Sequence, residues 1–298
     1  MAPAETEACP TFLRFLRQVT AGDEAMIAYL KRWCGYRLTG VTREHALLFV
    51  YGPGGNGKSV LINTLAGILG TYAANAALDT FTVATGERHP ADLAALSGAR
   101  LVTVTEVEEG RAWAEARIKA VTGGDAITAR FMRHDYFTYT PTYKLMISGN
   151  HQPILRNVDD AMRRRLHMLP FLHKPEHPDP ELPARLREEW PGILRWMING
   201  CLEYQRTGLK PPPAVVEATR AYFDAQDHFG QWLKERCVLG PDRSARPGEL
   251  LDDFKAWCTE NGVPFRDNKW LKPLLVQVPG VRYAKVKGSQ LVRGIGLK

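Results

Sequence analysis

The chain has 298 residues, of which 45% are hydrophobic, 24% charged and 9% aromatic. This composition is typical of a folded globular protein and excludes a disordered tail, a collagen-like fibre and a small disulfide-rich domain. No apolar run reaches the roughly 18 residues of a membrane-spanning helix, and the first residues lack the basic start and apolar core of a signal peptide. Without such a run we expect no membrane partner. Five widely spaced cysteines without a Cys-x-x-Cys pair favour a reduced, intracellular protein with no zinc site.

The formal net charge of +7 is concentrated at the C-terminal end. Residues 261–298 hold eight lysines and arginines and one acidic residue, so the other 260 residues balance to zero. An excess confined to one end indicates a module that binds a polyanion. Apolar residues such as Trp270, Val281 and Tyr283 alternate with the charges, which favours a folded module over a solvated tail.

Apolar periodicity predicts alternating helices and strands over the first 171 residues. Helical spacing marks residues 9–38, 60–69 and 112–121, and short apolar runs typical of buried strands lie at 46–51, 101–105, 143–148 and 166–171. Strands that alternate with helices predict an α/β fold with a mainly parallel sheet flanked by helices.

Proline-rich segments at 174–180 and 210–213 mark a change of organisation. Helical patterns follow at 190–202, 214–236 and 247–261, and short alternating segments lie at 280–288 and 290–293. Helices followed by a small basic hairpin suit a winged-helix-like domain. The sequence therefore predicts three parts, namely a helical segment 1–43, a core with a helical lid 44–210, and a helical linker with the basic domain 211–298.

The most specific motif is Gly-Pro-Gly-Gly-Asn-Gly-Lys-Ser at 52–59, which matches the G-x-x-x-x-G-K-[ST] phosphate-binding template between an apolar strand and an amphipathic helix. Glycines let backbone N–H groups surround a phosphate, and the helix directs its positive end at it. Lys58 would reach the outer phosphates and Ser59 would coordinate Mg²⁺. The predicted nucleotide-binding residues are Gly52, Gly54, Gly55, Asn56, Gly57, Lys58, Ser59 and Val60.

Polar residues follow two further strands. Glu106 comes directly after the strand 101–105 and is predicted to hold Mg²⁺, with Glu108 as the base that polarises water. The alternative is that Glu108 and Glu109 form an acidic surface loop. Asn150, after the strand 143–148, would contact the γ-phosphate or orient water, although an asparagine that caps a turn is the ordinary explanation.

Three arginines, Arg163, Arg164 and Arg165, precede the strand 166–171. One of them would reach the nucleotide of a neighbouring subunit and stabilise transition-state charge, as arginine fingers do. A solvated basic turn explains the spacing equally well.

Taken in order, these motifs resemble superfamily 3 helicases, in particular the poxvirus and phage/plasmid primase-helicase branch. The resemblance is carried by residues 52–59, 106–110, 116–125, 127–133, 148–153 and 164–166. It implies a P-loop AAA+-type ATPase that uses ATP and Mg²⁺ and moves along single-stranded DNA as a hexameric ring, usually 3′ to 5′. It assigns Lys58 and Ser59 to the first motif, Glu106 and Glu108 to the second, Asn150 to the sensor, and Arg164 and Arg165 to the arginine pair.

The resemblance also explains the alternating segments at 127–132 and 136–139. In the family such a hairpin projects into the ring channel and grips DNA, so Arg130, Arg133 and His134 are predicted DNA contacts. The first and last parts of the chain look like the family's collar and winged-helix parts. In the latter, the predicted DNA contacts are Lys269, Lys272, Lys285 and Lys287.

The implied partners are single-stranded and forked DNA, five further copies of the chain and a separate primase or polymerase. The implied setting is the cytoplasm of a bacterial host, with the gene carried by a phage or mobile element. Arg163 stands where the family often has an aromatic residue, and the spacing Glu-Val-Glu leaves the base open. Because only about fifty residues precede the P-loop, we do not expect primer synthesis, whether the chain is a fragment or a stand-alone helicase.

Two other functions stay open from the sequence. The chain would be a replication initiator or loader if it bound origin DNA and used ATP mainly to assemble. A small-molecule kinase would also use a P-loop, but it leaves the basic C-terminal end and the arginine pair unexplained.

Overall fold

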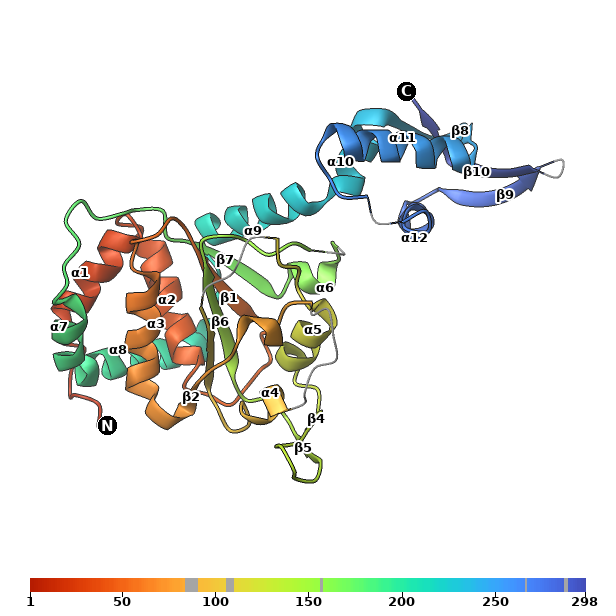
Figure 1. Cartoon of the computed structure of the whole chain (residues 1–298). Coiled ribbons are helices and arrows are strands. Elements are labelled where there is room, and N and C mark those ends of the chain that lie inside the picture. Colours follow the sequence, from red (N-terminus) through yellow and green to blue (C-terminus); the bar gives the residue numbers. More distant parts are fainter. Residues whose placement is uncertain (84–90, 106–109, 156–157, 266, 287–288) are drawn as a thin grey trace. The chain divides into compact units, whose positions relative to one another are not determined.

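The structure of the protein is a computed structural model that describes residues 1–83, 91–105, 110–155, 158–265, 267–286 and 289–298. It divides into two compact units, residues 1–223 and 224–298, each of which has its own core (Figure 1). No helix in the described part of the chain is long and apolar enough to cross a membrane.

The first unit is built on a five-stranded sheet with the order β2-β3-β6-β1-β7, in which every neighbouring pair is parallel. Its strands are β1 (Leu47–Tyr51), β2 (Ala73–Asn75), β3 (Leu101–Val104), β6 (Lys144–Gly149) and β7 (Leu166–Pro170). A separate antiparallel pair is formed by β4 (Ile127–Ala129) and β5 (Phe137–Tyr139).

The helices of the first unit cover both faces of this sheet (Figure 1). They are α1 (Pro10–Val19), α2 (Glu24–Tyr36), α3 (Lys58–Leu69), α4 (Ala91–Ala94), α5 (Glu115–Gly123), α6 (Asp160–Arg163), α7 (Leu182–Glu188), α8 (Trp190–Thr207) and α9 (Pro213–Gln226), with short 3₁₀ turns η1 (Gly70–Tyr72) and η2 (Leu78–Thr80).

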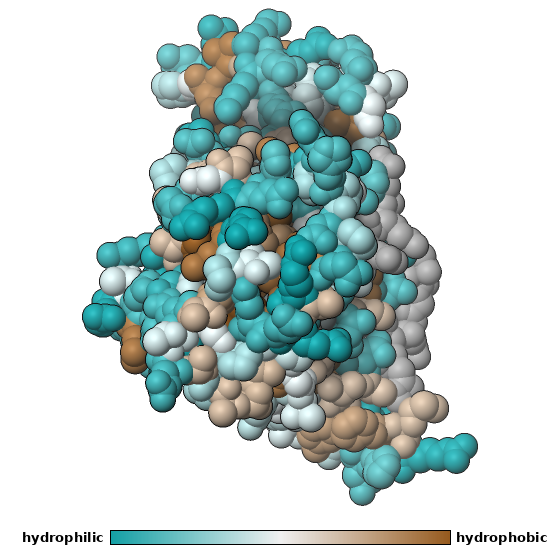
Figure 2. Space-filling model, turned by 90° about the vertical axis from the view of Figure 1, so that its left-hand side faces the viewer, coloured by the Kyte–Doolittle hydropathy of each residue, from teal (hydrophilic) through white to brown (hydrophobic). Residues whose placement is uncertain are grey.

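Alternate residues of each strand enter different cores, because successive side chains of a strand point to opposite faces. Leu48 and Val50 of β1 pack with α1, α2, α3 and α8, whereas Leu47 and Phe49 pack with α5 and α9. The sheet is therefore buried on both faces, as a parallel sheet with crossover helices requires. The face that carries α1 and α7 is mostly hydrophilic, with hydrophobic side chains visible in small patches (Figure 2).

The predicted α/β core is confirmed, and its four predicted strands correspond to β1, β3, β6 and β7. The edge strand β2 was not predicted, since its three residues carry no long apolar side chain. The helix predicted at 112–121 begins only at Glu115, because Ala112 and Trp113 form isolated bridges to Ile154 and Thr82. The boundaries predicted near residues 43 and 210 stay predictions.

In the described residues of the second unit, a three-stranded antiparallel sheet is accompanied by three helices. Its elements are α10 (His228–Arg236), β8 (Cys237–Ala245), α11 (Pro247–Glu260), α12 (Leu271–Gln277), β9 (Arg282–Val286) and β10 (Ser289–Leu297), and the strand order is β8-β10-β9. Trp232, Phe254 and Trp257 are buried at its centre. The predicted helix 247–261 and the C-terminal hairpin are confirmed, whereas β8 was not predicted.

The helical pattern predicted at 214–236 corresponds to two helices, α9 and α10, and the break between them has a local cause. Asp227 lies between α9 and α10, and its Oδ1 accepts a hydrogen bond of 2.9 Å from the backbone N–H of Gly230. An aspartate that accepts from the third residue of a helix is a strong N-cap, so α10 begins anew after Asp227.

Two glycines allow α2 and α8 to cross in close contact. A Cβ placed on Gly35 would lie 2.0 Å from the backbone N of Cys201 and 2.3 Å from the carbonyl C of Gly200. A Cβ on Gly200 would in turn lie 2.1 Å from the carbonyl O of Lys31. The helices therefore meet backbone to backbone, where no side chain can move aside.

We expect Gly35→Ala to destabilise the first unit by about 3 kcal/mol, because overpacking against backbone forces the helices apart. For a unit of this size the midpoint of thermal unfolding should fall by roughly 10 °C. Gly248→Ala is the matched control, since a Cβ there has no atom within 4 Å. An unchanged unfolding midpoint in Gly35→Ala would contradict this packing.

Candidate functional site

The 52–57 loop connects β1 to α3 at the carboxyl edge of the sheet, and its backbone requires glycine. Gly55 and Gly57 have φ values of 78° and 87°, in the left-handed region that other residues rarely adopt. A Cβ on Gly57 would also lie 2.7 Å from Cε2 of Phe15 and 2.8 Å from Cγ1 of Val19. The loop therefore packs directly against α1.

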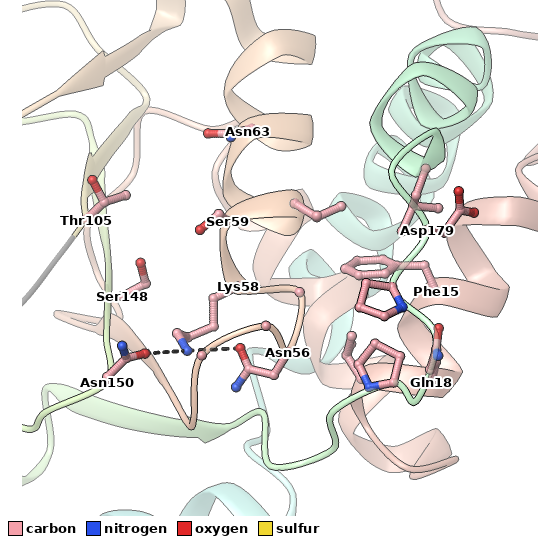
Figure 3. Close-up of a pocket in the computed structure, with 18 of the residues that line it drawn as sticks. Phe15, Gln18, Asn56, Lys58, Ser59, Asn63, Thr105, Ser148, Asn150 and Asp179 are labelled. Carbon is pink, nitrogen blue, oxygen red and sulfur yellow. Dashed lines mark hydrogen bonds between the residues drawn. The ribbon is translucent and has the colours of Figure 1, made fainter.

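Lys58 is buried, with 8% of its surface exposed, and its ammonium is held by four oxygen atoms. Nζ donates to the carbonyl O of Gly52 at 2.7 Å and of Pro53 at 3.1 Å, to Oδ1 of Asn56 at 2.9 Å and to Oδ1 of Asn150 at 3.0 Å. Burial lowers the pKa of Lys58. The two amide contacts are drawn in Figure 3.

Asn56 joins the loop to the residue that follows β7, the strand next to β1. It is almost completely buried; its Oδ1 accepts from Lys58 and its Nδ2 donates to the carbonyl O of Phe171, directly after β7. The Oδ1 and the Nδ2 of Asn56 are therefore both hydrogen-bonded, and this fixes the position of Lys58 relative to β7. The sequence placed Asn56 in the motif but gave no sign of this contact.

The N-terminal end of α3 faces the space in front of the 52–57 loop. Gly57 is its N-cap and offers no side-chain acceptor, so the first N–H groups of this 12-residue helix have no side-chain cap. Exposed backbone N–H groups and the positive end of the helix dipole make such a helix start a binding site for anionic oxygens. The exposed Ser59 and the half-buried Val60 line the space in front of it.

A cavity of about 790 Å³ opens in front of the loop, within the size range of small-molecule sites. Lys58 is the only lysine or arginine among the described residues that line it, and Ser148, Asn150, Thr105 and Asn63 also face it (Figure 3). Gly54 to Val60 also line it. The lining residues that were not predicted are Phe15, Gln18, Val19, Asn63, Thr105, Ser148, Gly149, Pro175, His177, Pro178, Asp179 and Leu182.

Two of these unpredicted groups form the far wall. Phe15, Gln18 and Val19 come from α1. Pro175, His177, Pro178 and Asp179 come from the segment before α7, and Leu182 is the first residue of α7. Lys174 lies beside the loop, because a Cβ on Gly55 would be 3.2 Å from its Cε. The proline-rich composition of 174–180 predicted only a loop, so nothing in the sequence placed this wall.

The predicted acidic residues Glu106, Glu108 and Glu109 lie outside the described residues. Thr105, the last described residue before them, lines the cavity after β3, and β3 pairs with β6. No group of three or more histidine, cysteine, aspartate or glutamate side chains within the described ranges is arranged to hold a metal ion. Of the predicted metal ligands, only Ser59 has a described position.

The arginine pair is split by burial. Arg165 is 8% exposed; its Nε donates to Oγ1 of Thr122 at 3.1 Å and its Nη1 donates to the carbonyl O of Ala161 at 2.8 Å. Burial, and next the charge of Arg164, lower the pKa of Arg165. Arg164 is exposed, and neither arginine is among the described residues that line the cavity.

The third arginine also packs within the first unit. The guanidinium of Arg163 lies 4.9 Å from the ring centroid of Phe223, in the geometry of a cation–π contact. The family resemblance expects an aromatic residue at this position, and here the chain supplies a cation that packs on an aromatic ring instead.

The predicted hairpin is confirmed as β4 and β5, with Thr128 opposite Thr138. It projects from the sheet (Figure 1), and Tyr139 Oη ties its base to the carbonyl O of Leu93 at 2.7 Å. Arg133 and His134 are exposed at its tip and Arg130 is half-buried. The structure thus brings these three predicted DNA contacts onto one projection.

Among the predicted DNA contacts of the second unit, Lys269, Lys272 and Lys285 are exposed. Lys272 Nζ lies 5.3 Å from the ring centroid of Tyr283. Lys287 lies outside the described residues.

Comparison with known proteins gives a consistent result. Residues 50–165 match a family model described as a family of unknown function, DUF5906. The chain is 25% identical to "Putative helicase 022R" of Frog virus 3 (isolate Goorha) over 261 residues, 80% of this chain, and 25% identical to "Putative helicase L207/L206" of Acanthamoeba polyphaga mimivirus over 270 residues, 83% of this chain. The chain is a distant homologue of viral putative helicases.

This homology confirms the family resemblance drawn from the motifs. The chain spans only about a quarter of the length of these curated relatives, 27% and 28%. Among solved structures, the apo C-terminal region of NrS-1 is similar with a TM-score of 0.59 at 13% identity, over 99% of this chain and 77% of that one. That similarity supports the fold as a whole.

We expect Asn56→Ala to weaken binding of nucleoside triphosphates by about tenfold, because removal of a buried hydrogen-bonding partner costs about 1–3 kcal/mol. Titration with a fluorescent triphosphate measures this loss. Asn63→Ala is the matched control, since Asn63 lines the same cavity but is exposed. Equal affinities in the two variants would show that Asn56 does not position Lys58.

Proposed function

We propose that this chain is an ATP-dependent DNA helicase that moves along single-stranded DNA as a hexameric AAA+-type ring. The observation that carries the proposal is the buried Lys58, held at the carboxyl edge of a parallel sheet by the P-loop and by Asn150 of the next strand. The chain is also distantly homologous to proteins named as putative helicases, which favours a helicase over the other functions that use a P-loop.

The nucleotide would lie in the cavity in front of α3. The N–H groups at the start of α3 and Lys58 suit the phosphates, and the wall formed by Phe15, Gln18 and residues 175–182 suits the rest of the molecule. Ser59, with Glu106 as the predicted second ligand, would hold Mg²⁺, which compensates phosphate charge when bound. Asn150, already in contact with Lys58, is placed to exchange that contact for one to the outer phosphate.

The positions of the arginines support a ring in which one copy completes the site of the next. Within the described part of the chain no arginine lines the cavity. An arginine that adds to the charge compensation by Lys58 and Mg²⁺ would therefore come from a neighbouring copy. We infer that Arg164 supplies it, because it is exposed and Arg165 is bound within its own subunit. An arginine supplied from outside the site stabilises the charge of phosphoryl transfer.

Two cationic regions would contact DNA. The β4–β5 hairpin carries Arg130, Arg133 and His134, and the second unit carries Lys269, Lys272 and Lys285 on a helix–strand–helix–helix–strand–strand order that suits a winged helix. Cations at such positions bind phosphates irrespective of sequence. The relatives are putative helicases of viruses, which suits a role in genome replication with a separate primase or polymerase supplying synthesis. A phage or mobile element in a bacterial host is the setting that the motif resemblance alone implies.

The direct test is ATP turnover with and without single-stranded DNA, followed by strand displacement on a forked duplex. We expect DNA to stimulate turnover several-fold, and Lys58→Ala to abolish turnover and displacement, because it removes the cation at the phosphates. Lys234→Ala, at an exposed lysine of α10, is the control and should behave as the wild type.

The outcomes separate the competing functions. DNA-stimulated turnover without displacement on any fork would favour the initiator or loader. Turnover that DNA leaves unchanged, together with phosphoryl transfer to a small molecule, would overturn the helicase in favour of a kinase.

A further inference from the structure

The tip of the β4–β5 hairpin, residues 130–137, exposes an unusual amount of apolar surface. Phe131, Met132 and Tyr136 are 47%, 69% and 60% exposed, within a stretch of six residues that are all exposed. Single exposed apolar residues are ordinary, but several large apolar side chains exposed together on one projection mark an interaction site.

The aromatic rings of the tip are held in ordered positions by their neighbours. The Phe131 ring stacks on that of Phe137, with centroids 5.6 Å apart and planes 19° apart. The guanidinium of Arg130 lies 4.8 Å from the centroid of the Tyr136 ring. These contacts restrict the rings and leave part of each exposed, so little order would be lost when a flat ligand stacks on them.

The Phe131–Phe137 pair and the Arg130–Tyr136 pair lie on opposite faces of the hairpin. Ala129 pairs with Phe137, and Thr128 pairs with Thr138, whose hydroxyls are 3.3 Å apart. Alternation continues beyond these pairs, so Arg130 and Tyr136 share the threonine face, while Phe131 joins Phe137 on the other. Each face therefore presents an aromatic ring.

The turn at the tip places a cation at the apex. The N–H of His134 donates to the carbonyl O of Phe131 at 3.2 Å, and Arg133, between them, has a φ of 61°. A turn normally uses glycine or asparagine at such a position. Unfavourable backbone conformations of this kind persist mainly at functional sites.

We propose that the hairpin tip is a stacking platform for the unpaired bases of single-stranded nucleic acid. The inference deepens the proposed function and rests on it. Aromatic faces stack on any base, and nearby arginines follow the backbone, which gives binding without sequence preference. In 130–137 two arginines and His134 stand against the single acid Asp135, so the charge suits a polyanion. A duplex hides its base faces, so the platform would select single strands.

The test compares two ligands with the full chain, a single-stranded oligonucleotide and an abasic strand of the same length and charge. We expect the wild type to bind the base-bearing strand about tenfold more tightly in fluorescence anisotropy. Tyr136→Ala and Phe131→Leu should lose this preference and keep the dependence on salt. Arg133→Gly, which suits the turn, should keep the preference and reduce the slope of log affinity against log salt by about 0.7.

The matched control is Tyr72→Ala, because Tyr72 is another exposed tyrosine, at 56%, with Arg100 6.0 Å from its ring centroid. It should change neither the preference for the base-bearing strand nor the salt dependence of binding, and thermal unfolding of each variant reports on folding.

Equal affinity of the wild type for both strands would overturn the platform while leaving the helicase proposal intact. Loss of self-association in Phe131→Leu with base preference unchanged would overturn it in favour of a contact between copies. Absence of any binding to single strands would contradict the proposed function itself.

Discussion

The ammonium of Lys58 is the constraint around which the site is arranged. A buried cation is stable only where oxygen atoms surround it, and here four of them do so. Two are carbonyls of the loop itself, which fold back because its glycines adopt left-handed conformations. The other two are side-chain amides, one of which depends on β6 and the other on β7. The site therefore exists only when β1, β6 and β7 are side by side.

The order of the strands supplies that arrangement. β1 lies between β6 and β7, so Asn150 and the carbonyl of Phe171 meet the loop from both sides. Ligands of open α/β sheets bind beyond the carboxyl ends of the strands, which is where the cavity lies. Four residues separate the β4–β5 hairpin from the strand β6, which ends next to Asn150. One strand thus connects the projection proposed to bind DNA with the cavity proposed to bind nucleotide.

The sequence was sufficient to predict the parts of the site that are local. The apolar runs predicted four of the five strands, and the spacing of 52–59 predicted the loop, because each depends on neighbouring residues. It was not sufficient for contacts between distant segments. Phe15 and residues 175–182 meet at one wall only after folding, and the amide of Asn56 shows its second partner only when Phe171 is in place.

Burial distinguishes two arginines that spacing alone did not. Arg164 and Arg165 are adjacent in the sequence and look equivalent there. The end of α6 turns one of them into the unit, where Thr122 and Ala161 bind it, and leaves the other exposed. A side chain that is already bound in its own subunit is poorly suited to reach another, which supports the role proposed for Arg164.

The central claim, that ATP is hydrolysed at a joint between two copies, is tested most directly by mixing inactive variants. Lys58→Ala and Arg164→Ala should each be inactive alone, since removal of a trans arginine costs about 10³-fold or more in rate. Mixed, they form joints with one intact Lys58 and one intact Arg164, so DNA-stimulated ATP turnover should return. Turnover that stays absent in the mixture, or an Arg164→Ala variant as active as the wild type, would contradict the claim.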